Sequence, residues 1–81
     1  MSLHEAAFKK RLGLGLKSAR ILAGLEQDEI AAAAGVKQSS VSRTERGLTS
    51  NLYTLLLMSQ ALNVDLGEII SDASEYANDR G

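Results

Sequence analysis

The sequence predicts an all-α fold, and three observations support this prediction. The chain contains no proline, and its only aromatic residues are two tyrosines and one phenylalanine, which leaves little material for strands. Alanine and leucine are frequent, and both favour helices. Apolar residues recur at spacings of three and four along most of the chain, as on one face of a helix. A chain of 81 residues is long enough for one compact domain with a modest core.

A first helix is predicted over residues 5–23, where four apolar side chains share one face: Phe8, Leu12, Leu16 and Ala19. Gly24 ends this helix, because glycine readily takes the left-handed conformation of a helix C-terminus. Gly13 and Gly15 lie inside it, and each costs about 1 kcal/mol relative to alanine. We therefore expect the N-terminal part of the helix to fray or to form a separate turn.

Two short helices should follow, over residues 27–34 and 38–46. Gly35 closes the first of them as a residue with positive φ, and Gly47 ends the second. Only Val36 and Lys37 separate Gly35 from the start of the second helix. So short a connection forces the two helices to cross steeply.

The segment 48–51 has the composition of a loop, and Asn51 is a suitable N-cap for a fourth helix that ends near Asn63. Its apolar residues are Leu52, Leu55, Leu56, Met58, Ala61 and Leu62. Asp65 can begin a short fifth helix that contains Leu66, Ile69 and Ile70. Because the chain is polar from Ser71 onward, residues 71–81 are predicted to form a frayed or disordered tail.

The formal net charge of −1 argues mildly against nucleic-acid binding, since domains that bind nucleic acids are usually basic. The charges are unevenly distributed, however. Before Gly47 the chain carries eight of its nine basic residues and five acidic ones, whereas the remainder carries one arginine and five acidic residues. A basic face can therefore exist on an acidic molecule. The alternative interpretation is an ordinary solvated surface.

Several functional classes lack the residues that they need. The chain has no cysteine, and His4 is its only histidine, so no disulfide and no metal site are expected. No histidine or obvious alternative base lies at a helical spacing from Ser39, Ser40 or Ser42, so a serine nucleophile lacks a partner and no enzyme is expected. Neither a cofactor nor a small-molecule ligand is expected. The sequence contains no signal peptide and no apolar run of membrane length. These observations predict a cytoplasmic protein without membrane contact.

Residues 27–46, QDEIAAAAGVKQSSVSRTER, resemble the helix-turn-helix of the Cro and lambda-repressor-like family, also called the XRE family. Gln27 opens the motif, and Ala31 supplies the small side chain that two closely crossing helices require. Gly35 supplies the positive φ of the turn. The remaining apolar positions of the motif are Ile30, Ala34, Val36 and Val41.

The resemblance covers about residues 12–70 and implies a compact five-helix domain over them. It leaves residues 1–11 as an extension that leads into the first helix, and residues 71–81 as a polar tail. In this family the third helix lies in the major groove of DNA, so residues 37–46 should form the recognition helix.

Carried over position by position, the resemblance implies base contacts at Lys37, Gln38, Ser39, Ser42 and Arg43. Gln38 can donate to and accept from the edge of adenine, and Arg43 can bind guanine O6 and N7 together. Phosphate contacts are implied at Gln27, Ser40, Arg46, Thr49, Ser50 and Asn51, although packing or a base contact is an equal alternative for Ser40. In most proteins, polar residues on the outward face of a helix are only solvated surface. The helix-turn-helix context favours DNA binding here.

The resemblance also implies a partly buried ion pair between Arg20 and Glu45, which would orient the first and third helices. Three features depart from the family pattern. Glu26 occupies a position where serine or threonine is usual and can repel DNA. Thr44 replaces a larger apolar residue and should leave a thinner core. The loop after Gly47 lacks the common proline and is shortened, which puts its phosphate contacts in question.

The predicted function is therefore sequence-specific binding of double-stranded DNA by a transcriptional regulator, a repressor that binds a palindromic operator as a homodimer. Further apolar side chains that can lie on the surface, and so form a dimer interface, are Leu14, Ile21, Leu22, Tyr53, Leu57, Ile69 and Ile70. Family precedent favours the last helix as that interface. The alternative is a protein-interaction module, an antitoxin or adaptor, that retains the helix-turn-helix fold.

Overall fold

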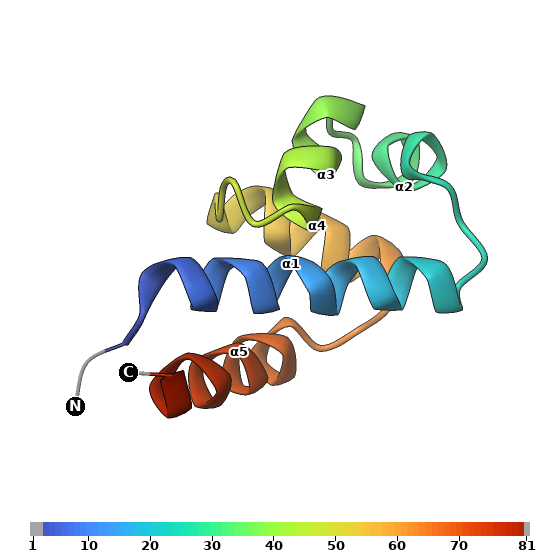
Figure 1. The fold of residues 1–81 in the computed structure, drawn as a ribbon. Coiled ribbons are helices and arrows are strands. Elements are labelled where there is room, and N and C mark those ends of the chain that lie inside the picture. Colours follow the sequence, from blue (N-terminus) through green and yellow to red (C-terminus); the bar gives the residue numbers. More distant parts are fainter. Residues whose placement is uncertain (1–2, 81) are drawn as a thin grey trace.

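The computed structural model describes residues 3–80 of the chain, and the side chains of residues 3–78. This part contains five α-helices and no strand: α1 (Glu5–Leu22), α2 (Gln27–Ala34), α3 (Gln38–Glu45), α4 (Leu52–Leu62) and α5 (Leu66–Arg80). The predicted all-α class with five helices is confirmed. In Figure 1, α1 runs through the middle of the molecule, with α3 and α4 on one side of it and α5 on the other. Among residues 3–80, no helix combines the length and the apolar character that crossing a membrane requires.

The ends of the helices follow from local residue chemistry. Gly35 has φ of 73°, and the next amide, that of Val36, donates to the carbonyl oxygen of Ala31 at 3.0 Å. This is the left-handed glycine termination that the sequence predicts for α2. At the start of α4, the side-chain oxygen of Asn51 accepts from the amide of Thr54 at 3.0 Å, as expected for an asparagine N-cap.

The expectation that Gly13 and Gly15 would loosen the N-terminal part of the first helix is wrong. α1 is one continuous helix from Glu5 to Leu22, and Gly13 is buried in it. A Cβ atom at Gly13 would lie 2.2 Å from the carbonyl oxygen of Thr44, at the C-terminal end of α3. Gly13 therefore permits a close approach of α1 to α3, and the packing offsets its poor helix propensity.

The expectation of a frayed or disordered tail from Ser71 onward is also wrong. α5 continues to Arg80 and lies antiparallel to α1 (Figure 1), and Ala73 and Ala77 on it are 0% exposed. Alanines four residues apart let the two helices approach closely. Gly81 lies outside the described residues.

Two polar contacts reinforce the packing of α5 on α1. The Nε atom of Arg11 lies 2.9 Å from a carboxylate oxygen of Asp72. The same guanidinium group lies 5.0 Å from the ring centre of Tyr76, within the range of a cation–π interaction. The polar composition that predicted disorder therefore includes residues that bind α1.

The hydrophobic core lies between the helices and contains side chains from all five of them. Leu16, Ile30, Val41 and Met58 are fully buried, and each comes from a different helix. The other members of the core cluster are Leu12, Ala31, Ala34, Leu55 and Ala73. Because all five helices contribute, the orientation of α3 is fixed by the whole domain and not by the two-helix motif alone.

Candidate nucleic-acid interface

The connection between α2 and α3 consists of Gly35, Val36 and Lys37. Ala31, on α2, is 5% exposed and belongs to the core, so a longer side chain there would separate the two helices. Lys37 is the N-cap residue of α3, with extended backbone angles, and its side chain is exposed. The short turn thus leaves the N-terminal end of α3 at the surface.

α3 has one face inside the domain and one face outside. Val41, Thr44 and Glu45 are buried. Of the five side chains expected to contact bases, Lys37, Gln38, Ser39 and Arg43 are exposed, and Ser42 is half-buried. The outward face therefore presents hydrogen-bond donors and acceptors together with two positive charges.

Thr44 fills a core position with a polar side chain but leaves no unsatisfied group there. Its hydroxyl donates to the carbonyl oxygen of Ser40 at 2.7 Å, one turn earlier in α3. Such a bond within the helix satisfies the hydroxyl without a partner from another element. The thinner core expected below α3 is accompanied by the close approach of Gly13, which brings the backbone of α1 to this position.

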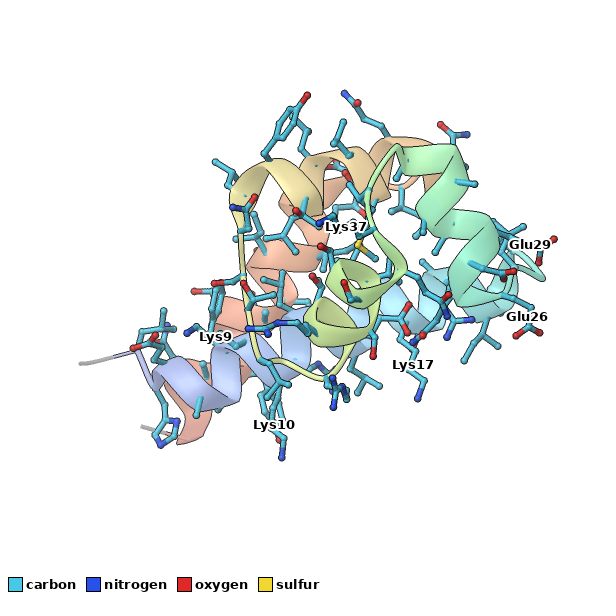
Figure 2. All side chains as sticks on the ribbon, turned by 90° about the horizontal axis from the view of Figure 1, so that it is seen from above. Lys9, Lys10, Lys17, Glu26, Glu29 and Lys37 are labelled. Atoms are coloured by element: carbon cyan, nitrogen blue, oxygen red, sulfur yellow. The ribbon has the colours of Figure 1, made fainter. Side chains whose placement is uncertain are left out.

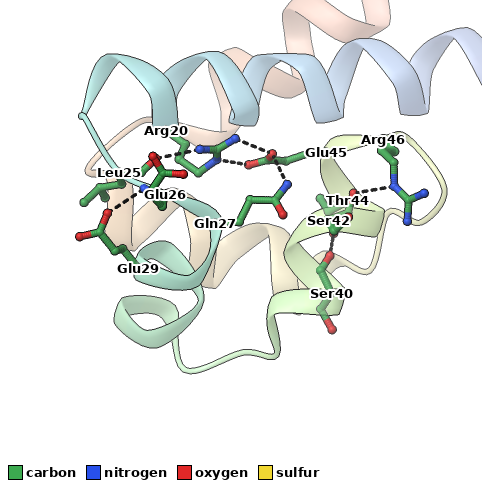
Figure 3. A network of polar contacts seen from close by, with 10 residues as sticks. All are labelled: Arg20, Leu25, Glu26, Gln27, Glu29, Ser40, Ser42, Thr44, Glu45 and Arg46. Atoms are coloured by element: carbon green, nitrogen blue, oxygen red, sulfur yellow. Dashed lines mark hydrogen bonds and ion pairs between the residues drawn. The ribbon is translucent and has the colours of Figure 1, made fainter.

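Arg20 and Glu45 form a two-pronged ion pair between α1 and α3 (Figure 3). Arg20 Nε lies 2.6 Å from Glu45 Oε2, and Nη2 lies 3.0 Å from Oε1. Both residues are buried, with 8% and 7% of their surfaces exposed. The hydrogen bond to Glu45 raises the pKa of the Arg20 guanidinium above its ordinary value, against the opposing effect of burial. Two parallel N–H···O bonds of this kind define the relative orientation of the two side chains and are stronger than neutral hydrogen bonds.

The network extends from this pair to α2. Arg20 Nη1 donates to the carbonyl oxygen of Leu25 at 2.7 Å, and Gln27 Nε2 donates to Glu45 Oε1 at 3.0 Å (Figure 3). One buried carboxylate thus joins α1, α3 and the first residue of α2. The sequence does not predict the bond from Gln27 to Glu45, since residues 18 positions apart show no local signal of contact.

Gln27 was expected at a phosphate contact, and the structure gives its amide group a partner inside the domain. The side chain is half-buried, and its Nε2 atom holds the bond to Glu45. The residue still begins α2, where backbone amides have no partner within the helix. Its position therefore combines support of the network with proximity to a helix N-terminus.

Glu26, the acidic residue that departs from the family pattern, is the N-cap of α2. Its backbone amide donates to Oε1 of Glu29 at 2.8 Å. In Figure 2 both carboxylates lie at the far side of α2 and point away from α3 and from Lys37. Both carboxylates lie beside the positive N-terminal end of α2, where negative charge is stabilising. They add no negative charge to the face of α3.

The segment after α3 presents the remaining expected phosphate contacts. Arg46 is exposed, and its Nε atom lies 3.4 Å from the carbonyl oxygen of Ser42, while Thr49 and Ser50 are half-buried. Asn51 is exposed, but its side-chain oxygen caps α4. Ser40 is half-buried, and its carbonyl oxygen binds Thr44. Donors on this segment are thus the Arg46 guanidinium, two hydroxyls and the Asn51 amide nitrogen.

Part of the negative charge of the molecule lies away from α3. α5 lies on the opposite side of α1 from α3 (Figure 1), and it carries the exposed acidic residues Glu68, Asp72 and Glu75. The exposed cations Lys37, Arg43 and Arg46 belong to α3 and its ends. An overall charge of −1 is therefore compatible with a positive surface at α3.

Comparison with known proteins agrees with this arrangement. A family model described as helix-turn-helix matches residues 16–69. Among solved structures, the chain is similar to the clp gene regulator ClgR from C. glutamicum. The TM-score is 0.76 and the identity 25%, over 86% of this chain and 91% of that one. A search of curated protein sequences finds no significant match. The family match covers more than half of the chain, and the chain therefore belongs to the XRE-type helix-turn-helix family of DNA-binding transcriptional regulators.

Proposed function

We propose that this protein represses transcription by binding a palindromic operator as a homodimer, with α3 of each copy in the major groove. The observation that carries the proposal is the outward face of α3, which is polar and basic, together with the buried Arg20–Glu45 network that fixes its orientation. Base recognition requires such rigid support, since small displacements of the helix would misalign its hydrogen bonds. Occupancy of an operator that overlaps a promoter would exclude RNA polymerase.

The roles of individual side chains follow from their chemistry. Arg43 binds guanine O6 and N7, Gln38 binds adenine N6 and N7, and Lys37 binds guanine or a nearby phosphate. The small hydroxyls of Ser39 and Ser42 allow the helix to approach the bases closely. The phosphates on the two sides are bound by a second set: Gln27, Ser40, Arg46, Thr49, Ser50 and Asn51. The similarity to a regulator of clp genes supports a role in gene regulation.

Arg43→Ala tests base recognition. The variant should lose about 1–3 kcal/mol of operator binding and relax the preference at one base pair, whereas Gln27→Ala should weaken binding to all sequences alike. The measurement is selection of bound sequences from random duplexes, followed by titration of the selected operator and its single-base variants. Gln60→Ala, an exposed glutamine on α4, is the control and should bind as the wild type does. Full affinity and selectivity in the Arg43→Ala protein would refute the assignment.

The dimer interface is proposed on the N-terminal part of α4. Leu52 and Tyr53 are 66% and 70% exposed, and exposed Leu48 and Leu56 adjoin them in the chain. A second copy bound here would lie beside the loop that contacts phosphates, so both copies would face the same duplex. α5, which family precedent favours, is a poorer surface, since it presents carboxylates to solvent and two copies would repel each other.

Leu52→Glu tests this interface. Placing a charge within the apolar surface should convert the dimer to a monomer in analytical ultracentrifugation, because a buried unpaired charge opposes association. Leu22→Glu, at a side chain 89% exposed near the end of α1, is the control and should leave the dimer intact. A Leu52→Glu protein that sediments as the wild type does would exclude α4 as the interface.

The exposed apolar residues of α4 also favour a second candidate, a protein-interaction module that has kept the fold. Salt dependence separates the two functions. Binding to duplex DNA must weaken steeply between 50 and 200 mM salt. The reason is that binding releases cations from the phosphates, and added salt opposes this release. Absence of any salt-dependent duplex binding would favour the interaction module.

A further inference from the structure

An open groove lies between the N-terminal half of α1 and the segment that follows α3. Its volume is about 610 Å³, and its lining residues are Glu5, Ala6, Lys9, Lys10, Arg46, Gly47 and Leu48. The two walls are far apart in the sequence but in direct contact. A Cβ atom at Gly47 would lie 2.8 Å from Cα of Lys10, so the two backbones touch. The geometry of the groove is therefore fixed by the packing of α1 against the end of α3.

The groove carries a net positive charge. Lys9 is paired with Glu5 at 2.8 Å, so these two charges compensate each other. Lys10 and Arg46 are exposed, and no carboxylate in residues 3–78 forms an ion pair with either of them. Two uncompensated cations, one on α1 and one at the C-cap of α3, thus border one groove, on a chain whose total charge is −1.

The groove also continues the surface of the recognition helix. Arg43 and Arg46 are three residues apart, so they lie on neighbouring positions of one helical face. Arg46 belongs both to that face and to the wall of the groove. In Figure 2 Lys10 projects from α1 away from the body of the domain, on the same side as Lys17. A DNA backbone that borders the major groove occupied by α3 would pass beside Arg46 and reach Lys10.

We propose that this groove binds a phosphate of the DNA backbone next to the base pairs read by α3, with Lys10 and Arg46 as its two ligands. The inference rests on the proposed DNA binding and extends the interface to α1, outside the helix-turn-helix. The ligand is a phosphodiester of the duplex: a rigid backbone held by α3 presents it to the groove at high effective concentration, whereas a free phosphate must bind to two flexible side chains in water.

Lys10→Gln tests the proposal. With the selected operator duplex, the slope of log K against log salt should become shallower by about one unit, which corresponds to about a tenfold weaker complex near 100 mM salt. Lys10→Arg should restore the wild-type slope, because it keeps the charge. Lys10 is exposed, so the substitution should not alter the thermal unfolding midpoint measured by circular dichroism.

Arg11→Gln is the matched control. It removes one positive charge from the neighbouring residue of the same helix, but Arg11 faces α5 and pairs with Asp72. It should therefore leave the salt slope unchanged. If the slope of log K against log salt is the same for Lys10→Gln and the wild type, the inference is overturned. Salt-dependent binding by the wild type would in that case still support DNA recognition. If the wild type does not bind duplexes, the proposed function itself fails. Inorganic phosphate at constant ionic strength should not compete with the duplex; competition that Lys10→Gln abolishes would reassign the groove to free phosphate.

Discussion

Gly13→Ala should destabilise this protein, although the same substitution within most helices is stabilising. A new Cβ atom would lie 2.2 Å from the carbonyl oxygen of Thr44 and 2.8 Å from that of Glu45. Both are backbone atoms at the end of α3, so no side-chain rotation relieves the contact. Restoring an ordinary separation of about 3.5 Å would require α1 and α3 to move apart by about 1 Å.

Two opposing effects determine the size of the change. Alanine gains about 1 kcal/mol over glycine in helix propensity. Overpacking a close contact costs about 1–3 kcal/mol. The upper end of this range applies here because the new Cβ atom would clash with two carbonyl groups. The separation would also stretch the Arg20–Glu45 pair, which joins the same two helices. We therefore expect a net loss of about 2 kcal/mol, which lowers the melting temperature of a domain of this size by about 8–16 °C.

Gly15→Ala is the matched control, since it makes the same change one half-turn further along α1. Its Cβ atom would meet the side chain of Ile69, with Cγ2 nearest at 3.0 Å, and that side chain can shift. Thermal unfolding followed by circular dichroism at 222 nm should place Gly13→Ala well below the wild type and Gly15→Ala close to it. A Gly13→Ala protein as stable as the wild type would refute the close contact between α1 and α3.

Two further predictions concern the buried pair and the last helix. Arg20→Ala should cost about 3–5 kcal/mol in urea unfolding, because the buried carboxyl group of Glu45 would lose its ion-pair partner. Replacing both Arg20 and Glu45 with leucine should cost less than the single change, and an unchanged midpoint for Arg20→Ala would contradict the pairing. Ala73→Asp should unfold the domain at a much lower temperature, since an unpaired carboxylate would be buried between α5 and α1. Ser71→Asp, on the exposed side of α5, should change stability by less than about 0.5 kcal/mol; equal melting of these two variants would indicate that α5 does not pack on α1.

Much of the local structure could be predicted from residue spacing and capping chemistry. The positive φ at Gly35, the N-cap at Asn51 and the short turn before α3 all depend on neighbouring residues, and neighbouring residues are visible in a sequence. The outward position of Lys37, Gln38, Ser39 and Arg43 also agrees with the helical pattern. The family and the fold class followed from the same residues.

The incorrect predictions concern contacts between helices. Polar residues around Ala73 and Ala77 suggested a disordered tail, but helix order there depends on burial of the two alanines against α1. Gly13 suggested a weak N-terminal part of α1, because helix propensity describes an isolated helix. It takes no account of a neighbouring backbone such as that of α3.

The sequence by itself determined the number and order of the helices and the helix-turn-helix, because these arise from interactions within a few residues. The tertiary structure decided which polar side chains from distant segments lie together. It gave Gln27 a partner in Glu45 and brought Lys10 beside Arg46. It also separated the acidic face of α5 from α3 (Figure 1). Each of these depends on the packing of distant segments around α1, and no local pattern encodes the distance between such segments.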